Sequence, residues 1–199
     1  LLNKYDVIGI EDAAYFGMDF RENYGSPKKA PFIPTIARYA DNYFIIISSS
    51  KIFSYAGQRI AVVIISPNLK GKRYDNLSNY FNTNKVGHAF VHGGIYPTTA
   101  GVSRTAQNAL AALFESASSG LYNFLNEVKV YSKRANKIKK IFLSQGFKIV
   151  YDNDIDRPIG DGFYFTASKD DMTGEELLFL MLCYGMAGIP LSTTGSLRE

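Results

Sequence analysis

The stretch that most constrains how this chain can fold runs from residue 43 to residue 66, where two apolar runs flank a polar turn. The run 43–47 is typical of a buried strand, and the run 60–65 is typical of the next strand. Three serines and Lys51 follow the first run directly, and Arg59 follows Lys51 by eight residues. Ligands of open α/β sheets bind beyond the carboxyl ends of the strands. The sequence therefore places two cations and several hydroxyl groups at a site suited to an anion.

A second motif precedes this stretch. Residues 12–15 (Asp-Ala-Ala-Tyr) follow the apolar residues 7–10, and Asp12 lies 39 residues before Lys51. Together with Ser-Ser-Ser-Lys at 48–51 and Gly-Gln-Arg at 57–59, this motif resembles the Asp-x-x-Tyr, Ser-x-Ser-Lys and Gly-x-Arg elements of the class I/II aminotransferases, pyridoxal-phosphate enzymes of fold type I. The order and spacing of the elements carry the resemblance, which covers most of the chain. Ala61 departs from the glycine that many members have two places after the arginine.

The resemblance implies a role for each matched residue. Lys51 would be the catalytic residue: it would bind pyridoxal 5'-phosphate as an imine and later move the substrate α-proton. Asp12 would pair with the pyridine nitrogen, so that the ring accepts electrons from the substrate α-carbon. Tyr15 would donate a hydrogen bond to the ring oxygen. The phosphate would be held by Ser48, Ser50 and Arg59.

The implied reaction is the transfer of an amino group between an amino acid and a 2-oxo acid. Carbon–sulfur lyases, decarboxylases and cyclising synthases share the signature, because the imine chemistry is common to all of them. Two other classes stay open, an aminotransferase-like sensor domain of a transcription regulator and a folded fragment that binds no cofactor. Taken singly, Lys51 is typical of a solvated loop lysine and Arg59 of a surface ion pair, and only their conjunction with Asp12 favours the cofactor site.

The resemblance also predicts an α/β fold class and its division into domains. Residues 1–96 would be the C-terminal portion of a large cofactor-binding domain with a mixed, mostly parallel sheet. Residues 97–145 would form dimer-facing and interdomain helices, with Ser103 and Arg104 as candidates for a homodimer interface. Residues 146–199 would be a small α+β C-terminal domain, truncated near Arg198, in the region where the family's substrate-carboxylate arginine lies. The chain would be the C-terminal half of the enzyme and inactive alone, because the family's helix-terminus phosphate site precedes Asp12.

Periodicity and end signals predict the remaining elements. Residues 16–34 are rich in proline and glycine and are expected to lack regular structure. Strands are expected at 5–10, 147–151, 162–167 and 189–191, and helices at 36–40, 74–84, 99–116, 122–145 and 174–186. Residues 88–96 are expected to form a glycine-broken connector, and 152–161 an exposed acidic loop.

Composition narrows the function classes. The net charge of +4 is too small to indicate nucleic acid, and the basic residues between 129 and 140 are expected to form a solvated helix face. The single Cys183 excludes an intrachain disulfide and favours a reducing cytoplasm. His88 and His92 do not give zinc-like ligand spacing with it, so no metal site is predicted. No run approaches the ~18 apolar residues of a membrane helix, so a soluble, cytoplasmic protein is expected.

Overall fold

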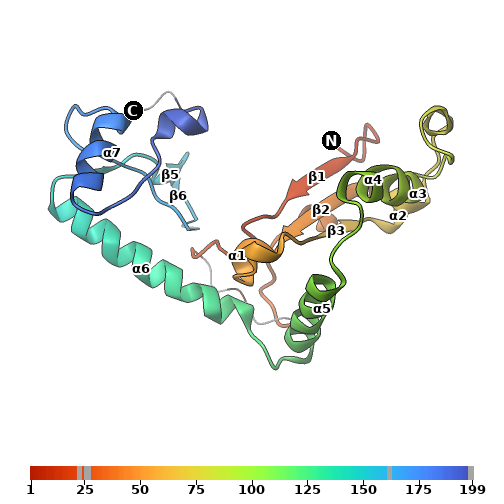
Figure 1. Ribbon diagram of the computed structural model, residues 1–199. Coiled ribbons are helices and arrows are strands. Elements are labelled where there is room, and N and C mark those ends of the chain that lie inside the picture. Colours follow the sequence, from red (N-terminus) through yellow and green to blue (C-terminus); the bar gives the residue numbers. More distant parts are fainter. Residues whose placement is uncertain (22–23, 25–27, 161–162, 197–199) are drawn as a thin grey trace. The chain divides into compact units, whose positions relative to one another are not determined.

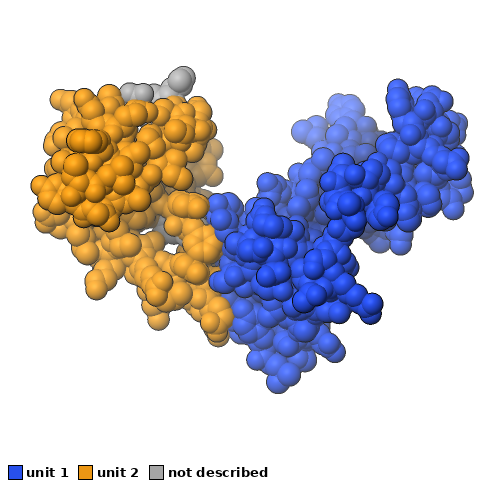
Figure 2. All heavy atoms as spheres, in the orientation of Figure 1, with its two compact units in different colours: residues 1–17, 24–125 blue, residues 18–23, 126–199 orange. Residues whose placement is uncertain are grey.

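The protein has a mixed α/β fold with small mixed and antiparallel sheets. The structure is a computed structural model that describes residues 1–21, 24, 28–160 and 163–196 (Figure 1). The chain divides into two compact units (Figure 2). The first unit comprises residues 1–17 and 24–125, and the second comprises residues 18–23 and 126–199. The boundary at residue 125 falls inside the segment 97–145, to which the sequence assigned interdomain helices.

The first unit is built on a three-stranded sheet in the order β1-β2-β3 (Figure 1). β1 (Gly9–Asp12) is parallel to β2 (Tyr43–Ser48), and β3 (Ala61–Ile65) is antiparallel to β2. The two strands expected around Lys51 are thus confirmed, and β2 extends one residue further than expected, to Ser48. Because β1 ends at Asp12 and lies beside β2, the Asp-x-x-Tyr motif and the serine run leave the sheet at the same edge.

The strand expected at residues 5–10 begins only at Gly9. The preceding residues form a turn, in which the amides of Tyr5 and Val7 donate to the carbonyls of Leu1 and Leu2. Asp6 has a φ of 51°, a left-handed conformation that does not occur within a strand. The apolar residues of this segment predicted a strand, but the backbone forms hydrogen bonds within a local turn instead of pairing with a neighbouring strand.

A polar network joins this turn to the sheet. Buried Asn42 donates to the Asp6 carboxylate at 2.6 Å and accepts from Asn68 at 2.8 Å. The ammonium of half-buried Lys72 also donates to Asp6. The hydrogen bond from Lys72 lowers the pKa of the Asp6 carboxyl below its ordinary 3.8, and the hydrogen bond to Asp6 raises the pKa of Lys72 above its ordinary 10.5.

These pKa shifts predict a pH window of stability for the pair. A lowered carboxyl pKa stabilises the fold above about pH 4 and loses that effect as the pH falls through the folded-state pKa, whereas the raised Lys72 pKa loses its effect only above about pH 10.5. We expect Asp6→Asn to lower the Tm at neutral pH and to have progressively less effect as the pH falls through the lowered folded-state pKa of Asp6, because asparagine tolerates a positive φ and still accepts from Asn42. Thermal unfolding against pH, with Asp41→Asn as the control carboxyl, measures this. A Tm difference independent of pH would contradict it.

The first unit also contains helices, most of which are short. They are the α-helices α1 (Ser49–Ile52), α2 (Pro67–Gly71), α3 (Val86–His88), α4 (Tyr96–Thr99) and α5 (Arg104–Ser119), the π-helix η4 (Ala89–Ile95), and the 3-10 helices η1 (Ile36–Arg38), η2 (Ala56–Gln58) and η3 (Asp75–Asn79). The helix expected at 74–84 is only the short η3, and the one expected at 36–40 is η1. The described residues of 16–34 form no helix or strand, in agreement with the expectation.

The expectation of a glycine-broken connector at 88–96 is wrong, because these residues continue a helical run that starts at Val86 and ends at Thr99. Gly93 allows close packing instead of breaking the helix. A Cβ on Gly93 would lie 2.1 Å from Cδ1 of Phe81, so only glycine fits there without a shift. The helix expected from residue 99 therefore begins later, at Arg104, after the Ser103 hydroxyl accepts from the amide of Ala106 as an N-cap.

One cluster of the core in the first unit joins the start of β3 to α5. It consists of Ile60, Ala106 and Leu110, and the side chains packed around it are Phe53, Tyr55, Val62, Leu113 and Phe114. The Phe53 ring stacks edge-on against Phe114, with centroids 5.4 Å apart. This packing holds the segment that follows Lys51 against α5.

The second unit contains most of α6 (Phe124–Ser144), with α7 (Gly174–Cys183) and the 3-10 helix η5 (Leu191–Thr194). Its strands are two residues long: β4 (Lys148–Ile149) pairs with β7 (Ala167–Ser168), and β5 (Asn153–Asp154) with β6 (Arg157–Pro158). The long α6 confirms the helix expected at 122–145. Five basic residues of α6 are exposed, as expected, whereas Lys139 is half-buried near the Phe165 ring.

Three expectations for the second unit need correction. The acidic loop 152–161 folds, in its described residues, into the β5–β6 hairpin, with Ile155 at a positive φ. The strand expected at 189–191 is absent from the described residues, because Thr193 and Thr194 bond back to the carbonyls of Pro190 and Leu191 and close η5. The strands at 147–151 and 162–167 shrink to β4 and β7, and residues 161–162 lie outside the described part of the chain.

Within the described part of the chain, no helix is long and apolar enough to cross a membrane.

Candidate functional site

Lys51 lies in α1, a single turn that starts where β2 ends. The Ser48 hydroxyl accepts from the amide of Ser50 at 3.2 Å, so Ser48 is the N-cap that turns the strand into the helix. This local bond explains why a serine-rich sequence follows the apolar run. The Ser48 O–H and the half-buried Ser50 side chain remain at the sheet edge where a ligand would bind.

Ser49 is a site residue that the sequence reasoning missed. Its side chain is 1% exposed, and its Oγ donates to the carbonyl oxygen of Ile60 at 2.6 Å. Its backbone amide donates to the same oxygen at 3.3 Å, and its own carbonyl accepts from the amide of Tyr55. Ser49 therefore fastens the Lys51 turn to the start of β3. In the sequence, Ser49 is one of three consecutive serines before Lys51, and nothing distinguishes it from Ser48 or Ser50 as the buried one.

Asp12 ends the neighbouring parallel strand. It pairs with Ile46 of β2, and directly paired residues project to the same face of a sheet. Ser48 lies two residues beyond Ile46 on that face, so the carboxylate and the N-cap hydroxyl share one face at one edge. The exposed Asp12 carboxylate accepts from the amide of Ala14 at 3.0 Å, which turns the chain toward Tyr15.

Tyr15 and Lys51 are brought together in space. The Lys51 ammonium lies 5.6 Å from the centroid of the Tyr15 ring, within the range of a cation–π contact. Lys51 is half-buried and Tyr15 is 45% exposed, so the amine is partly sheltered at an accessible position. The structure thus joins the two motifs, which are 36 residues apart from Tyr15 to Lys51 in the chain, at one edge of the sheet.

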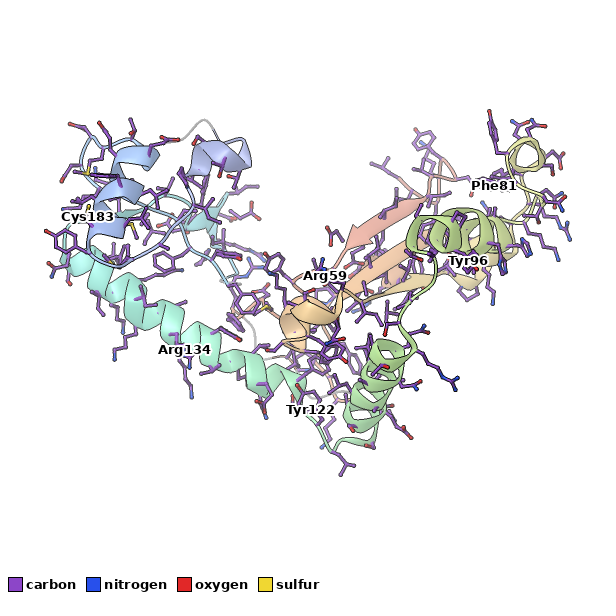
Figure 3. The ribbon with its side chains drawn as sticks, in the orientation of Figure 1. Arg59, Phe81, Tyr96, Tyr122, Arg134 and Cys183 are labelled. Carbon is purple, nitrogen blue, oxygen red and sulfur yellow. The ribbon has the colours of Figure 1, made fainter. Side chains whose placement is uncertain are left out.

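Arg59 lies on the segment between α1 and β3 (Figure 3). Its backbone is left-handed, with a φ of 51°, and its guanidinium Nη1 donates to the carbonyl of Ala56 at 3.0 Å. The side chain is exposed. Arg59 therefore follows the Lys51 turn, but its described hydrogen bond is to its own loop, and binding a phosphate would require the guanidinium to exchange that carbonyl for the anion.

Among the described residues, no group of three or more His, Cys, Asp or Glu side chains is arranged to hold a metal ion. The segments that follow β1 and β2 instead carry an amine, a carboxylate, a phenol and two hydroxyl groups, and the guanidinium of Arg59 lies on the loop before β3. Such a set can hold an anionic ligand at one end and a protonated ring nitrogen at the other. No protein-family model and no curated protein matches the chain.

Proposed function

We propose that the chain belongs to a pyridoxal-phosphate-dependent aminotransferase and that Lys51 is the residue that binds the cofactor covalently. The observation that carries this proposal is the placement of Asp12 and Lys51 relative to the sheet. Asp12 ends β1, Lys51 lies in the turn that follows the neighbouring parallel strand β2, and the Lys51 ammonium lies against the Tyr15 ring. The three-stranded sheet would then be part of the large domain of fold type I, and the substrates would be an amino acid and a 2-oxo acid.

The residues at this edge fit the chemical groups of the cofactor. The Lys51 amine would bind the aldehyde carbon and would later accept and return the substrate proton. The Asp12 carboxylate would keep the pyridine nitrogen protonated, and the Tyr15 hydroxyl would donate to the ring oxygen. The phosphate dianion would accept hydrogen bonds from Ser48, Ser50 and Arg59. When bound, the cofactor supplies the electron sink that allows a bond at the substrate α-carbon to break.

The arrangement also favours reaction of the cofactor aldehyde with Lys51 over reaction with other lysines. The groups proposed to hold the cofactor lie on the segments next to Lys51, whereas Lys70 of α2 is an exposed lysine with no such proposed set. A cofactor whose phosphate and ring nitrogen are held nearby would therefore react with Lys51 first, because the two groups meet at a high effective concentration.

The test is the position of covalent labelling. The chain is incubated with pyridoxal 5'-phosphate, reduced with borohydride and digested, and the labelled lysines are mapped by mass spectrometry. We expect Lys51 to be labelled at least about tenfold faster than Lys70, a difference of about 1.4 kcal/mol in activation free energy. Lys51→Ala is expected to remove the fast label, and Lys70→Ala to leave it unchanged.

Two further variants separate a specific site from a reactive lysine. Asp12→Asn and Arg59→Ala each remove a proposed contact with the cofactor without touching Lys51, and both are expected to slow its labelling. Equal labelling of Lys51 and Lys70, or Lys51 labelling that neither variant slows, would refute the proposal.

A further inference from the structure

The only two histidines of the chain lie side by side. The ring centroids of His88 and His92 are 4.4 Å apart, and their planes are tilted by 41°. Both side chains are exposed. They are four residues apart in the helical run from Val86 to Thr99, where α3 passes into the π-helix η4. A π-helix has i to i+5 hydrogen bonds and therefore more than four residues per turn, so residues four apart lie on one face.

The helical segment that carries the two rings is held firmly. Phe90, between the histidines, packs against Phe44 of β2 with ring centroids 4.6 Å apart. Ala89 is buried, and Gly93 lies directly against the Phe81 ring. The backbone positions of both histidines are therefore fixed by packing on the sheet and on the segment that contains Phe81. Ligands on a rigid element lose little conformational entropy when they bind an ion.

The separation of the rings matches two imidazoles that share one ion. A transition ion about 2.1 Å from one nitrogen of each ring, with the two nitrogens at a cis angle, places the ring centroids about 4.5 Å apart. Because the side chains are exposed, each ring can turn about its terminal bond to direct a nitrogen at the ion. Two histidines four residues apart on one helical face are also the ligand pair that helical metalloprotease motifs use.

We infer that His88 and His92 form a two-ligand binding site for a late first-row divalent ion such as Cu²⁺, Ni²⁺ or Zn²⁺. Neutral imidazole nitrogen is a preferred donor for these ions. Within the described part of the chain, no third His, Cys, Asp or Glu joins the pair, so water or an external ligand completes the coordination. The site belongs to the first unit and is independent of the role proposed for Lys51.

The test uses Cu²⁺ alone, added to the tag-free chain in a Cys183→Ser background, because the exposed Cys183 thiol is a competing soft ligand. We expect calorimetry to show a site with one ion per chain, and electron paramagnetic resonance of the complex to show two equivalent nitrogen donors. His88→Ala and His92→Ala are each expected to weaken binding at least about tenfold, because either change removes the chelate and leaves a single imidazole.

A matched control keeps two histidines in the chain but separates them. In His92→Ala/Leu121→His the second imidazole moves to the exposed position 121, outside the helical run, and this variant is expected to bind as weakly as His92→Ala. All exchanged side chains are exposed, and far-ultraviolet circular dichroism verifies that each variant is folded. A control that binds Cu²⁺ as tightly as the parent chain, or a resonance spectrum with one nitrogen donor, would overturn the inference.

Discussion

Replacing Gly17 by alanine is expected to lower the free energy of unfolding by about 3 kcal/mol. Gly17 has a φ of +76°, a left-handed conformation that costs an L-residue roughly 1–2 kcal/mol. The added Cβ would also lie 2.6 Å from Cδ1 of Ile52 and 3.0 Å from Cδ2 of Leu125, both of which are buried. Overpacking a tight core costs a further ~1–3 kcal/mol. Urea unfolding followed by far-ultraviolet circular dichroism measures the loss.

Gly120 provides the matched control for this substitution. It belongs to the same unit and has a similar φ of +82°, but nothing lies within 4 Å of a Cβ built there. Gly120→Ala is therefore expected to cost only the backbone term, about 1 kcal/mol. The difference between the two variants isolates the contacts with Ile52 and Leu125. If both variants lose the same stability, the close packing around Gly17 contributes nothing, and the prediction is wrong.

Ser49→Ala is expected to lower the free energy of unfolding by about 1–2 kcal/mol, because the buried carbonyl of Ile60 loses its 2.6 Å donor. The amide of Ser49 still donates to that carbonyl at 3.3 Å, which limits the loss. The change also loosens the turn that carries Lys51. We therefore expect slower covalent labelling of Lys51 by pyridoxal 5'-phosphate, at a protein concentration and temperature where the variant is fully folded.

The adjacent Ser50 is the control for Ser49. Ser50 is half-buried, and its backbone amide makes the bond to Ser48, so Ser50→Ala keeps that bond. We expect its unfolding free energy to stay within about 0.5 kcal/mol of the parent chain. A Ser50→Ala variant as unstable as Ser49→Ala would show that the Ile60 contact is not the cause. Labelling that slows in Ser50→Ala without a change in stability would instead support a direct contact of Ser50 with the phosphate.

Long elements were predictable because their signals repeat along the chain. α6 follows its helical apolar period over 21 residues, and β2 and β3 follow continuous runs of Ile and Val. The errors fall on segments whose local signals are weak or interrupted. Residues 88–96 contain two glycines, which in a sequence are typical of helix breakers. Gly93 is nevertheless part of the helical run, because only glycine fits where the helix meets Phe81. Ile189 and Leu191 have apolar side chains typical of strands, but the hydroxyl groups of Thr193 and Thr194 close a 3-10 turn that begins at Leu191.

The candidate site was likewise predictable only in part. The spacing of Asp12, Lys51 and Arg59 could be read from the sequence because each follows or precedes an apolar run. The contact between Lys51 and Tyr15, the inward bond of Ser49 and the turn of Arg59 toward Ala56 could not, because each depends on a side-chain direction that the backbone sets. The pairing of His88 with His92 was likewise hidden while the segment was expected to be a connector.

By itself, the amino-acid sequence determined which segments are apolar enough to be strands or long helices, and which polar residues lie at their ends. Those features are local, since periodicity and capping act over a few residues. Tertiary structure alone decided the register that pairs Asp12 of β1 with Ile46 of β2, and that residues 86–99 form one helical run against Phe44 and Phe81. Such arrangements depend on contacts between residues far apart in the chain, where packing outweighs local propensity.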